Sequence, residues 1–361
     1  MALADIMQLF FLRGMKKIMD KVLITGAAGF IGSHVAELFC NNGIDTGCLV
    51  RNGSNLENLK GLSARMEYGD IEDYDRLAEV LKGYSCVIHI AAYARDWGPY
   101  ERFFRTNTEG TMNVLKACSA NGISDIIITS SCSVYGEEDC PGIKDENSPH
   151  NSHYPYFADR IFKSALNYYR DTKAEGKLRA MEYAKEKGMN LTVIEPVWVY
   201  GEREFNTGFY EYLKTAKSGI PFLPGSVRNK FHTVYVKDLA RAYFTAYSKK
   251  LKGVQSFIIG SREVEYMDRI YSLFCSKAGI KKPGNLPKAL VYPLGFSAEL
   301  AYTLLGLKNP PLLTRGRVNM FYDNIEYSTK RAAEVLGFKS EFSLEEGIEK
   351  TVKWYKDRGL I

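Results

Sequence analysis

The stretch "KVLITGAAGFIG", residues 21–32, decides the fold class of this chain. Its first five residues are a short apolar run of strand type, and a helical pattern follows the glycines. Glycines at 26, 29 and 32 let the backbone turn tightly, approach a pyrophosphate and pack helix against strand, while the helix N-terminus offers N–H donors to phosphates. The spacing G-x-x-G-x-x-G is one residue longer than the usual fingerprint. Strand, turn and helix together predict a dinucleotide-binding site.

The alternation of strand and helix patterns continues through the first half of the chain. Such alternation predicts a parallel sheet with helices on both faces. Further strands are predicted at 46–50, 65–69, 86–90, 125–129 and 191–195, and helices over 31–42, 73–82, 104–121 and from about Tyr169 to 187.

The pattern loosens after Pro196. Helices are predicted near 207–218, 237–248, 265–278, 288–306 and 343–358, with one strand at 256–260 that returns to the sheet. We therefore expect an N-terminal extension over 1–19, a dinucleotide-binding domain over 20–195, and a smaller, mostly helical substrate lobe over 196–361. The fold class is α/β, of the Rossmann type.

Composition excludes several classes of function. With a net charge of +6 and no arginine-rich tract, nucleic-acid binding is not expected. Seven cysteines without C-x-x-C spacing suit free thiols in a reducing cytoplasm. His150 and His153 lie in a loop without fixed partners, so no metal site is expected.

Two apolar stretches raise the question of a membrane segment. The apolar core of residues 1–20 is too short to span, and Met15 or Met19 could be the real start. Residues 286–307 are interrupted by a lysine, a proline and a glutamate, which favours an amphipathic helix over a span.

A tyrosine–lysine pair is the strongest candidate for chemistry. Tyr169 and Lys173 are four residues apart and would share a helix face. The chain has two more such pairs, beginning at Tyr183 and Tyr210, so position must decide between them. Ligands of open parallel sheets bind beyond the carboxyl ends of the strands. Tyr183 comes eight residues before Leu191 and falls towards the opposite edge, and Tyr210 follows the last core strand, which leaves Tyr169.

With "TGAAGFIG", "SSCSVYG" and this pair in order, the chain resembles the extended short-chain dehydrogenase/reductase family from about residue 20 onward. "HIAAYARDWGPY" is similar to the 3β-hydroxysteroid dehydrogenase and dihydroflavonol reductase branch. The resemblance implies a homodimer and an acid/base couple of Tyr169 and Lys173. It also implies a hydrogen bond from Ser131 to the substrate carbonyl and a supporting Asn107.

The resemblance also implies the residues around the cofactor. They are Gly26, Ala28, Gly29, Phe30, Ile31 and Gly32 of the glycine-rich turn, Asp70, Ile71, Ala91 and Ala92 after later strands, Tyr169 and Lys173, and Pro196 and Val199. Arg51 stands where an acidic residue would hold the ribose of NAD. A guanidinium suits a 2′-phosphate, so we expect NADP, with NAD as the alternative.

The reaction class is inferred from which residues replace those of related enzymes. A dehydratase would carry Thr-Asp-Glu where this chain has Ser131, Cys132 and Ser133, all of which we expect at the substrate. Arg95 and Trp97 are expected to flank the cleft. Sugar-nucleotide epimerases tend to have an arginine where Phe231 stands, although Arg228 and Lys230 are near, and Arg-Pro where this chain has Glu195-Pro196, whose glutamate has no assigned role. We expect interconversion of a secondary alcohol and ketone on an apolar substrate, with a nucleotide-sugar epimerase as the alternative.

Overall fold

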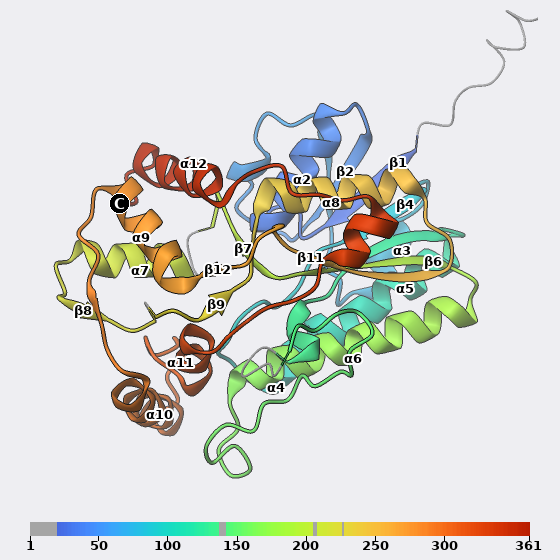
Figure 1. Ribbon diagram of the computed structural model, residues 1–361. Coiled ribbons are helices and arrows are strands. Elements are labelled where there is room, and N and C mark those ends of the chain that lie inside the picture. Colours follow the sequence, from blue (N-terminus) through green and yellow to red (C-terminus); the bar gives the residue numbers. More distant parts are fainter. Residues whose placement is uncertain (1–19, 137–141, 205–207, 226) are drawn as a thin grey trace, which may run out of the picture.

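A seven-stranded parallel sheet forms the centre of the computed structural model, which describes residues 20–136, 142–204, 208–225 and 227–361 (Figure 1). The strand order is β11-β6-β5-β4-β1-β2-β3. Consecutive strands run outward from β1 in both directions, and the order reverses between β1 and β4. A ligand-binding crevice is expected at that reversal. The strands are β1 (Lys21–Thr25), β2 (Asp45–Val50), β3 (Ala64–Tyr68), β4 (Cys86–His89), β5 (Asp125–Thr129), β6 (Asn190–Pro196) and β11 (Val254–Ile259).

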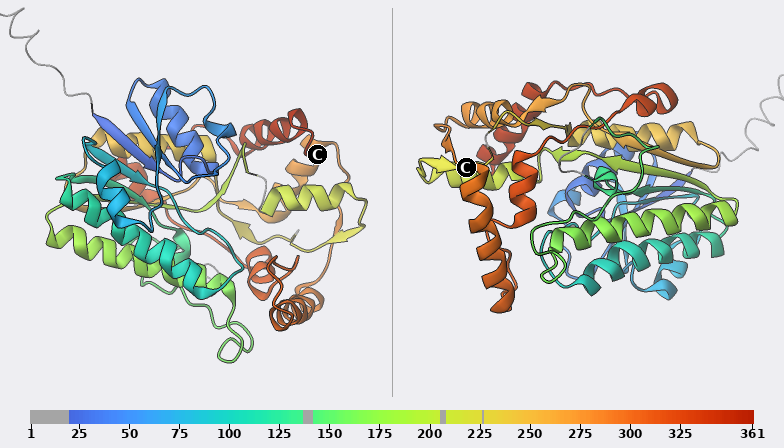
Figure 2. Two further views of the ribbon diagram at one scale, coloured as in Figure 1. Left: turned by 180° about the vertical axis from the view of Figure 1, so that it is seen from behind. Right: turned by 60° about the horizontal axis from the view of Figure 1, so that its bottom comes forward.

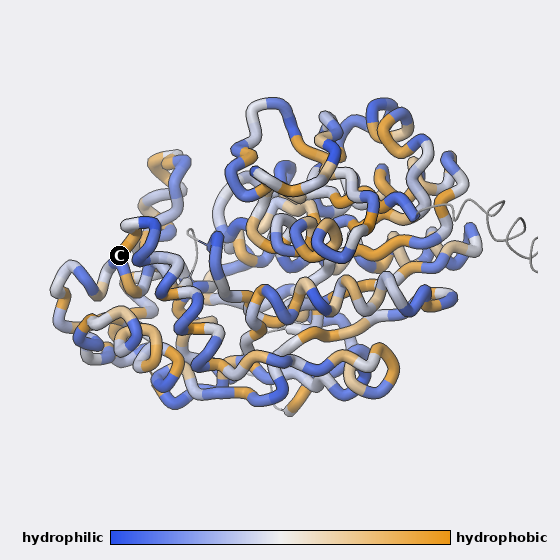
Figure 3. Tube along the Cα trace, turned by 90° about the horizontal axis from the view of Figure 1, so that it is seen from above, coloured by the Kyte–Doolittle hydropathy of each residue, from blue (hydrophilic) through white to orange (hydrophobic). Residues whose placement is uncertain are grey.

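Helices cover both faces of the sheet (Figures 1 and 2). One face carries α2 (Phe30–Asn41) and α8 (Val236–Lys249), and the other carries α3 (Tyr74–Val80), α5 (Gly110–Ala120) and α6 (Ala165–Glu186). Side chains of β1 alternate between these layers: Val22 and Ile24 pack towards α2, and Leu23 packs into the opposite core. Hydrophobic and hydrophilic residues alternate along the flanking helices as well (Figure 3). The predicted α/β class of Rossmann type is confirmed.

The predicted helix over 104–121 is interrupted. The structure has a short α4 (Tyr100–Phe103), then a π-helical segment η2 (Phe104–Glu109), then α5. Helix α6 crosses η2 in backbone contact, because a Cβ on Gly176 would lie only 2.5 Å from the carbonyl oxygen of Asn107. The π-helix widens the turn that carries Asn107, and such segments are common at functional sites.

The second half builds a lobe beside the carboxyl ends of the strands (Figure 1). Its helices are α7 (Gly208–Lys217), α9 (Met267–Ala278), α10 (Lys288–Leu304), α11 (Arg315–Tyr322), a π-helical η4 (Ala332–Leu336) and α12 (Leu344–Asp357). Three two-stranded ladders join them: β7 (Trp198–Tyr200) with β10 (Thr233–Tyr235), β9 (Lys230–Phe231) with β12 (Glu265–Tyr266), and β8 (Phe222–Leu223) with β13 (Gly284–Asn285). The sequence did not predict these strands, because two or three residues carry no periodic signal.

Part of the predicted second lobe lies in the sheet layer. β11 pairs with β6 along its whole length, and α8 packs on α2, with the rings of Phe39 and Phe244 5.3 Å apart. Residues 1–19, the predicted N-terminal extension, fall outside the described residues, as does Cys140. Among the residues that the structure describes, no helix combines the length and apolarity needed to cross a bilayer.

Candidate active site

The glycine-rich turn between β1 and α2 has the shape of a phosphate cradle. Gly26 adopts a positive φ of 70°, and a Cβ there would lie 2.7 Å from the backbone nitrogen of Ala91, after β4. A Cβ on Gly32 would lie 2.1 Å from the carbonyl oxygen of Gly26, so helix and turn are in backbone contact. Gly29 caps α2 without any side-chain hydrogen bond, and the first helical turn holds no acidic residue. The N–H groups of the first helical turn, before the Ser33 amide that bonds the Gly29 carbonyl oxygen, are therefore available to an anion.

The other predicted cofactor residues lie at the same edge of the sheet. Arg51 follows β2 and is exposed, at the start of a turn closed by the Ser54 amide on its carbonyl oxygen, 3.1 Å away. Asp70 follows β3, and its carboxylate accepts the Glu72 amide at 3.0 Å. Ile71 is buried against Gly110. The remaining members sit beside this edge: Ala28, Ile31, Ala91 and Ala92 are partly buried, Pro196 ends β6, and Val199 lies in β7.

The tyrosine–lysine pair lies in the first half of α6, against the carboxyl end of β5. The ammonium of Lys173 donates to the carbonyl oxygen of Thr129, the last residue of β5, at 2.5 Å. The Thr129 hydroxyl bonds the hydroxyl of Tyr243 at 2.6 Å, and Tyr169 is close enough to act electrostatically on Tyr243. The structure thus brings Tyr169 and Lys173 to the sheet edge that the glycine-rich turn occupies. Tyr183, by contrast, lies near the far end of α6.

The ammonium of Lys173 is stripped of water. Its burial lowers the pKa of Lys173 from 10.5 to about 8. The neighbouring His89 is likewise buried, and desolvation, with a smaller contribution from Lys173, lowers the pKa of His89 to about 3. A neutral His89 can then bridge the hydroxyls of Thr25, at 2.8 Å, and Thr111, at 3.1 Å. A lysine of this kind is costly to bury and is typical of a functional site.

This burial gives the cofactor-free protein a pH dependence that Lys173→Met would remove. Between pH 8 and 10.5 the unfolded chain still holds the lysine proton that the folded protein has released. The free energy of unfolding of the wild type therefore rises with pH in this window, relative to the variant, by roughly 3 kcal/mol. Urea unfolding of both proteins from pH 7 to 10.5 measures this difference.

The matched control is Lys185→Met, an exposed lysine on the same helix. Its unfolding free energy should follow that of the wild type across the pH range. Parallel curves for wild type and Lys173→Met would show that Lys173 is hydrated in solution.

The serine cluster after β5 is preorganised. Ser131 is buried and begins the short 3-10 helix η3 (Cys132–Tyr135). Its hydroxyl oxygen accepts the Ser133 hydroxyl at 2.8 Å and the Ser133 amide at 3.2 Å. Because Ser133 donates, the hydrogen of the Ser131 hydroxyl is left to donate elsewhere. Cys132 and Ser133 are buried in the same turn.

The side chain of Asn107 bonds two neighbouring segments of the protein. Its carboxamide oxygen accepts the Tyr93 amide at 2.8 Å, and its nitrogen donates to the Thr172 hydroxyl at 3.2 Å. The side chain is buried. Asn107 therefore ties the segment after β4 to α6 one residue before Lys173.

Of the two residues expected to flank the cleft, Trp97 contacts the second lobe and Arg95 is exposed. The indole of Trp97 donates to the carbonyl oxygen of Leu307 at 3.0 Å, and its ring meets Tyr302 of α10 edge-on. The neighbouring Asp96 pairs with Arg317 of α11. This segment thus connects the sheet to the second lobe. Arg95 is exposed and makes no bond with the residues that the structure describes.

A buried ionic network lies behind the serine turn, and the sequence did not predict it. Lys177, one turn after Lys173, pairs with Glu195 of β6 at 2.7 Å, and the two side chains are 2% and 0% exposed. The Tyr135 hydroxyl donates to Glu195 at 2.8 Å and accepts from Lys177 at 2.7 Å, while Ser256 of β11 donates to Glu195 at 2.5 Å. Glu195, to which the sequence assigned no role, therefore joins β6 to α6 and β11. Lys177 lies four residues after Lys173, so the same i, i+4 spacing already placed it on the helix face of Tyr169 and Lys173.

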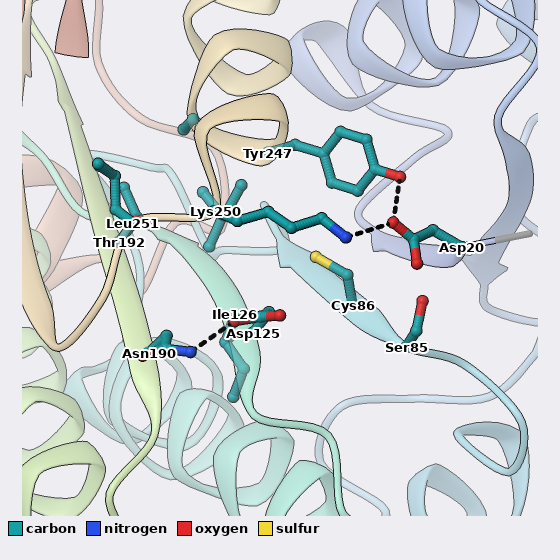
Figure 4. Close-up of a pocket in the computed structure, with 12 residues that line it drawn as sticks. Asp20, Ser85, Cys86, Asp125, Ile126, Asn190, Thr192, Tyr247, Lys250 and Leu251 are labelled. Atoms are coloured by element: carbon teal, nitrogen blue, oxygen red, sulfur yellow. Dashed lines mark hydrogen bonds and ion pairs between the residues drawn. The ribbon is translucent and has the colours of Figure 1, made fainter. Parts of the chain in front are cut away.

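The pocket of Figure 4 lies at the opposite, amino edge of the strands. It is bordered by Asp20, Cys86, Asp125 and Asn190 and closed by Lys250, whose ammonium pairs with Asp20 at 2.7 Å. Its volume is about 60 Å³, too small for a dinucleotide. It plays no part in the site described above.

Comparison with known proteins gives the family. The sequence pattern of the NAD dependent epimerase/dehydratase family matches residues 22–260, from β1 to the end of β11. The chain belongs to this family. The predicted family is therefore confirmed. The prediction of an enzyme of the extended short-chain dehydrogenase/reductase type is confirmed as well, since the relatives are reductases, dehydrogenases and epimerases.

Relatives within the family act on different substrates. A 2-alkyl-3-oxoalkanoate reductase of Shewanella oneidensis is 25% identical over 91% of this chain and 84% of its own. An N-acetyl-alpha-D-glucosaminyl-diphospho-ditrans,octacis-undecaprenol 4-epimerase of Escherichia coli O157:H7 is 28% identical over 93% and 95%. The sterol-4-alpha-carboxylate 3-dehydrogenase erg26 of Schizosaccharomyces pombe is 26% identical over 93% and 97%.

Solved structures agree with the fold. The crystal structure of gox2253 superposes with a TM-score of 0.77 at 26% identity, covering 95% of this chain and 99% of its own. The fold shared with that protein thus extends over the second lobe as well as the sheet.

Proposed function

We propose that this family member interconverts a secondary alcohol and the matching ketone on an apolar substrate, with NADP as cofactor. The observation that carries the proposal is the tyrosine–lysine pair at the carboxyl end of β5, with the Lys173 ammonium buried against Thr129. The glycine-rich turn fits a dinucleotide for two reasons. Its backbone is closely packed, and no side chain caps the N-terminus of α2.

Each residue then has a chemical role. The phenol of Tyr169 gives a proton to the carbonyl oxygen during reduction and takes it back during oxidation. A free tyrosine titrates near 10, and a positive charge on Lys173 favours its phenolate. Ser131 donates a hydrogen bond to the same oxygen, and Asn107 positions α6. The bound nicotinamide cofactor supplies or accepts the hydride.

The second lobe supports an apolar substrate over a nucleotide sugar. At the position where an epimerase tends to carry arginine, Phe231 is buried between Trp198 and Phe209. The nearby cations are engaged: Lys230 pairs with Glu326 at 2.6 Å, and Arg228 stacks on Tyr266. A diphosphate would need converging arginines that are free to bind it.

The relatives support the same substrate class and keep one alternative. A 2-alkyl-3-oxoalkanoate and a sterol carboxylate, named for two relatives, each combine a large apolar body with a carboxylate. The 4-epimerase of Escherichia coli O157:H7 favours epimerase chemistry on the same scaffold, although the sugar diphosphate in its name is linked to a polyprenol and not to a nucleoside.

A panel assay separates the two functions. Purified protein is incubated with NADPH or NADP and with sterols, terpenoid alcohols, 3-oxoacyl compounds and UDP- or GDP-sugars, and both nicotinamide absorbance and sugar epimers are measured. Turnover of an apolar ketone or alcohol supports the proposal. Epimerisation of a sugar without turnover of any apolar compound would establish the alternative.

The cofactor preference is tested at Arg51. We expect Arg51→Ala to weaken NADPH binding by about tenfold or more, because one charge-assisted contact to the 2′-phosphate is lost. NADH binding should change less than twofold. Isothermal titration of both proteins with both cofactors measures this.

Arg65→Ala serves as the control, because Arg65 is also exposed but lies near the amino end of β3, where it pairs with Asp45. Equal losses for NADPH and NADH on replacing Arg51, or a wild-type preference for NADH, would contradict the NADP assignment.

A further inference from the structure

Helix α10 exposes apolar side chains and buries its acidic one. All its exposed residues are uncharged, among them Leu290 and Leu294, each 62% exposed, and Leu304, 78% exposed. Its one acid, Glu299, is 2% exposed and forms an ion pair with Arg315 of α11. The exposed face of a helix on a water-soluble protein is normally polar or charged.

The loop before α6 continues this surface. The ring of Phe157 meets Phe296 of α10 edge-on, with centroids 5.2 Å apart, and the Phe157 amide donates to the Tyr292 hydroxyl at 3.3 Å. Arg315 clamps the loop from below by donating to the carbonyl oxygens of Phe157 and Phe162. At the tip, Ile161 is 93% exposed. Loop and helix lie on the same side of the molecule (Figure 1), and α10 projects from the body in the right-hand view of Figure 2.

We call the exposed side chains of α10, with Phe157, Ile161 and the leucines that follow the helix, the α10 face. Leu305, Leu307 and Leu312 are those following leucines. An exposed, connected set of large apolar side chains usually marks a contact surface. Because the side of α10 that carries Glu299 packs on α11, the side that carries the leucines is the one left open to a partner.

The exposed charged residues of the two segments that contribute to the α10 face, residues 154–164 and 305–314, are all positive. Arg160, Lys163 and Lys308 are exposed and make no ion pair with any residue that the structure describes. The acids of the loop before α6 and of α10, Asp159 and Glu299, are buried and engaged with His153 and Arg315. Exposed leucines on the same surface segments as unpaired cations match a bilayer surface with anionic headgroups.

From this complementarity we propose that the α10 face docks on an anionic lipid bilayer, with its leucines in the headgroup boundary and its three cations at the phosphates. A second copy of the chain fits less well. A symmetric pairing through this face would bring the same cations of both copies together without acids between them. The proposal needs no assumption about the substrate.

Vesicle flotation tests the proposal with the full chain and no substrate. Vesicles of phosphatidylcholine alone are compared with vesicles containing about 30% phosphatidylglycerol, whose negative charge attracts each surface lysine or arginine. The chain should float with the anionic vesicles, and binding should weaken at about 1 M salt, where screening is short-ranged. Leu290→Gln with Leu294→Gln should weaken binding by about tenfold per leucine. Neutralising Arg160, Lys163 and Lys308 to glutamine should weaken it by about fivefold per cation.

Ile143→Gln is the matched control, because Ile143 is also 62% exposed but lies outside the α10 face. It should bind like the wild type, and an unchanged melting temperature and NADPH titration show that each variant is folded. Absence of flotation with anionic vesicles, or equal binding by the leucine variant, overturns the proposal. If sedimentation shows a dimer that only the leucine variant loses, and vesicles do not bind, the partner is a second copy.

Discussion

Tyr169→Phe is expected to lower turnover by about a thousandfold or more, while NADPH binding stays within twofold. The reason is that phenylalanine keeps the ring in place on α6 and removes only the hydroxyl that would exchange the proton, and positioned acid/base groups contribute factors of this size. Steady-state rates with the best compound from the substrate panel, together with isothermal titration of cofactor, measure both quantities.

The adjacent tyrosine provides the control. Tyr168 points the other way on α6, where its ring meets those of Tyr100 and Phe103. Tyr168→Phe should keep turnover within a few-fold, as should Tyr183→Phe near the far end of the helix. Wild-type turnover by Tyr169→Phe would remove this tyrosine from the proposed site.

Lys177→Met is expected to lower the free energy of unfolding by about 3–5 kcal/mol, because it leaves the carboxylate of Glu195 buried without its cation. Adding Glu195→Gln should recover more than about 1 kcal/mol of that loss, since the amide carries no charge and still accepts from Tyr135 and Ser256. Urea unfolding of the wild type, both single variants and the double variant gives the coupling energy.

An exposed ion pair on the same helix is the matched control. Arg179 and Glu175 are 2.5 Å apart, but their side chains are 51% and 36% exposed. Arg179→Met should therefore cost less than about 1 kcal/mol. A similar cost for Lys177→Met would mean that water reaches the network around Glu195.

Local sterics made part of the site predictable. The glycine-rich turn could be predicted because Gly26 needs a positive φ and Gly32 has no room for a Cβ beside Gly26, and both constraints lie within seven residues of sequence. The pair of Tyr169 and Lys173 follows from helix spacing and from the edge at which α6 begins. Both inferences need only the local chain and the direction of a parallel strand.

What could not be predicted depends on contacts between distant segments. Glu195 was noticeable in the sequence, but its partner Lys177 precedes it on another element, and Ser256 follows on a third. The π-helix at Asn107 lies where α6 crosses in backbone contact at Gly176, which the local sequence of either element does not reveal. In α10, apolar residues occur at positions on every face of the helix, so the sequence pattern does not show which face is exposed. Packing against α11 decides that the leucines are exposed. The short α11 did have a signal, the Thr314 side chain that caps it.

The position of β11 at the edge of the sheet affects how the chain can be made. Strands β1 to β6 are complete when the ribosome has added Pro196, but the neighbour of β6 begins only at Val254. Until then β6 exposes a row of unpaired backbone groups, and Glu195 lacks the hydroxyl of Ser256. Open strand edges of this kind pair readily with other chains. The growing polypeptide therefore passes through an aggregation-prone stage, and a fragment ending at residue 195 would be arrested in it.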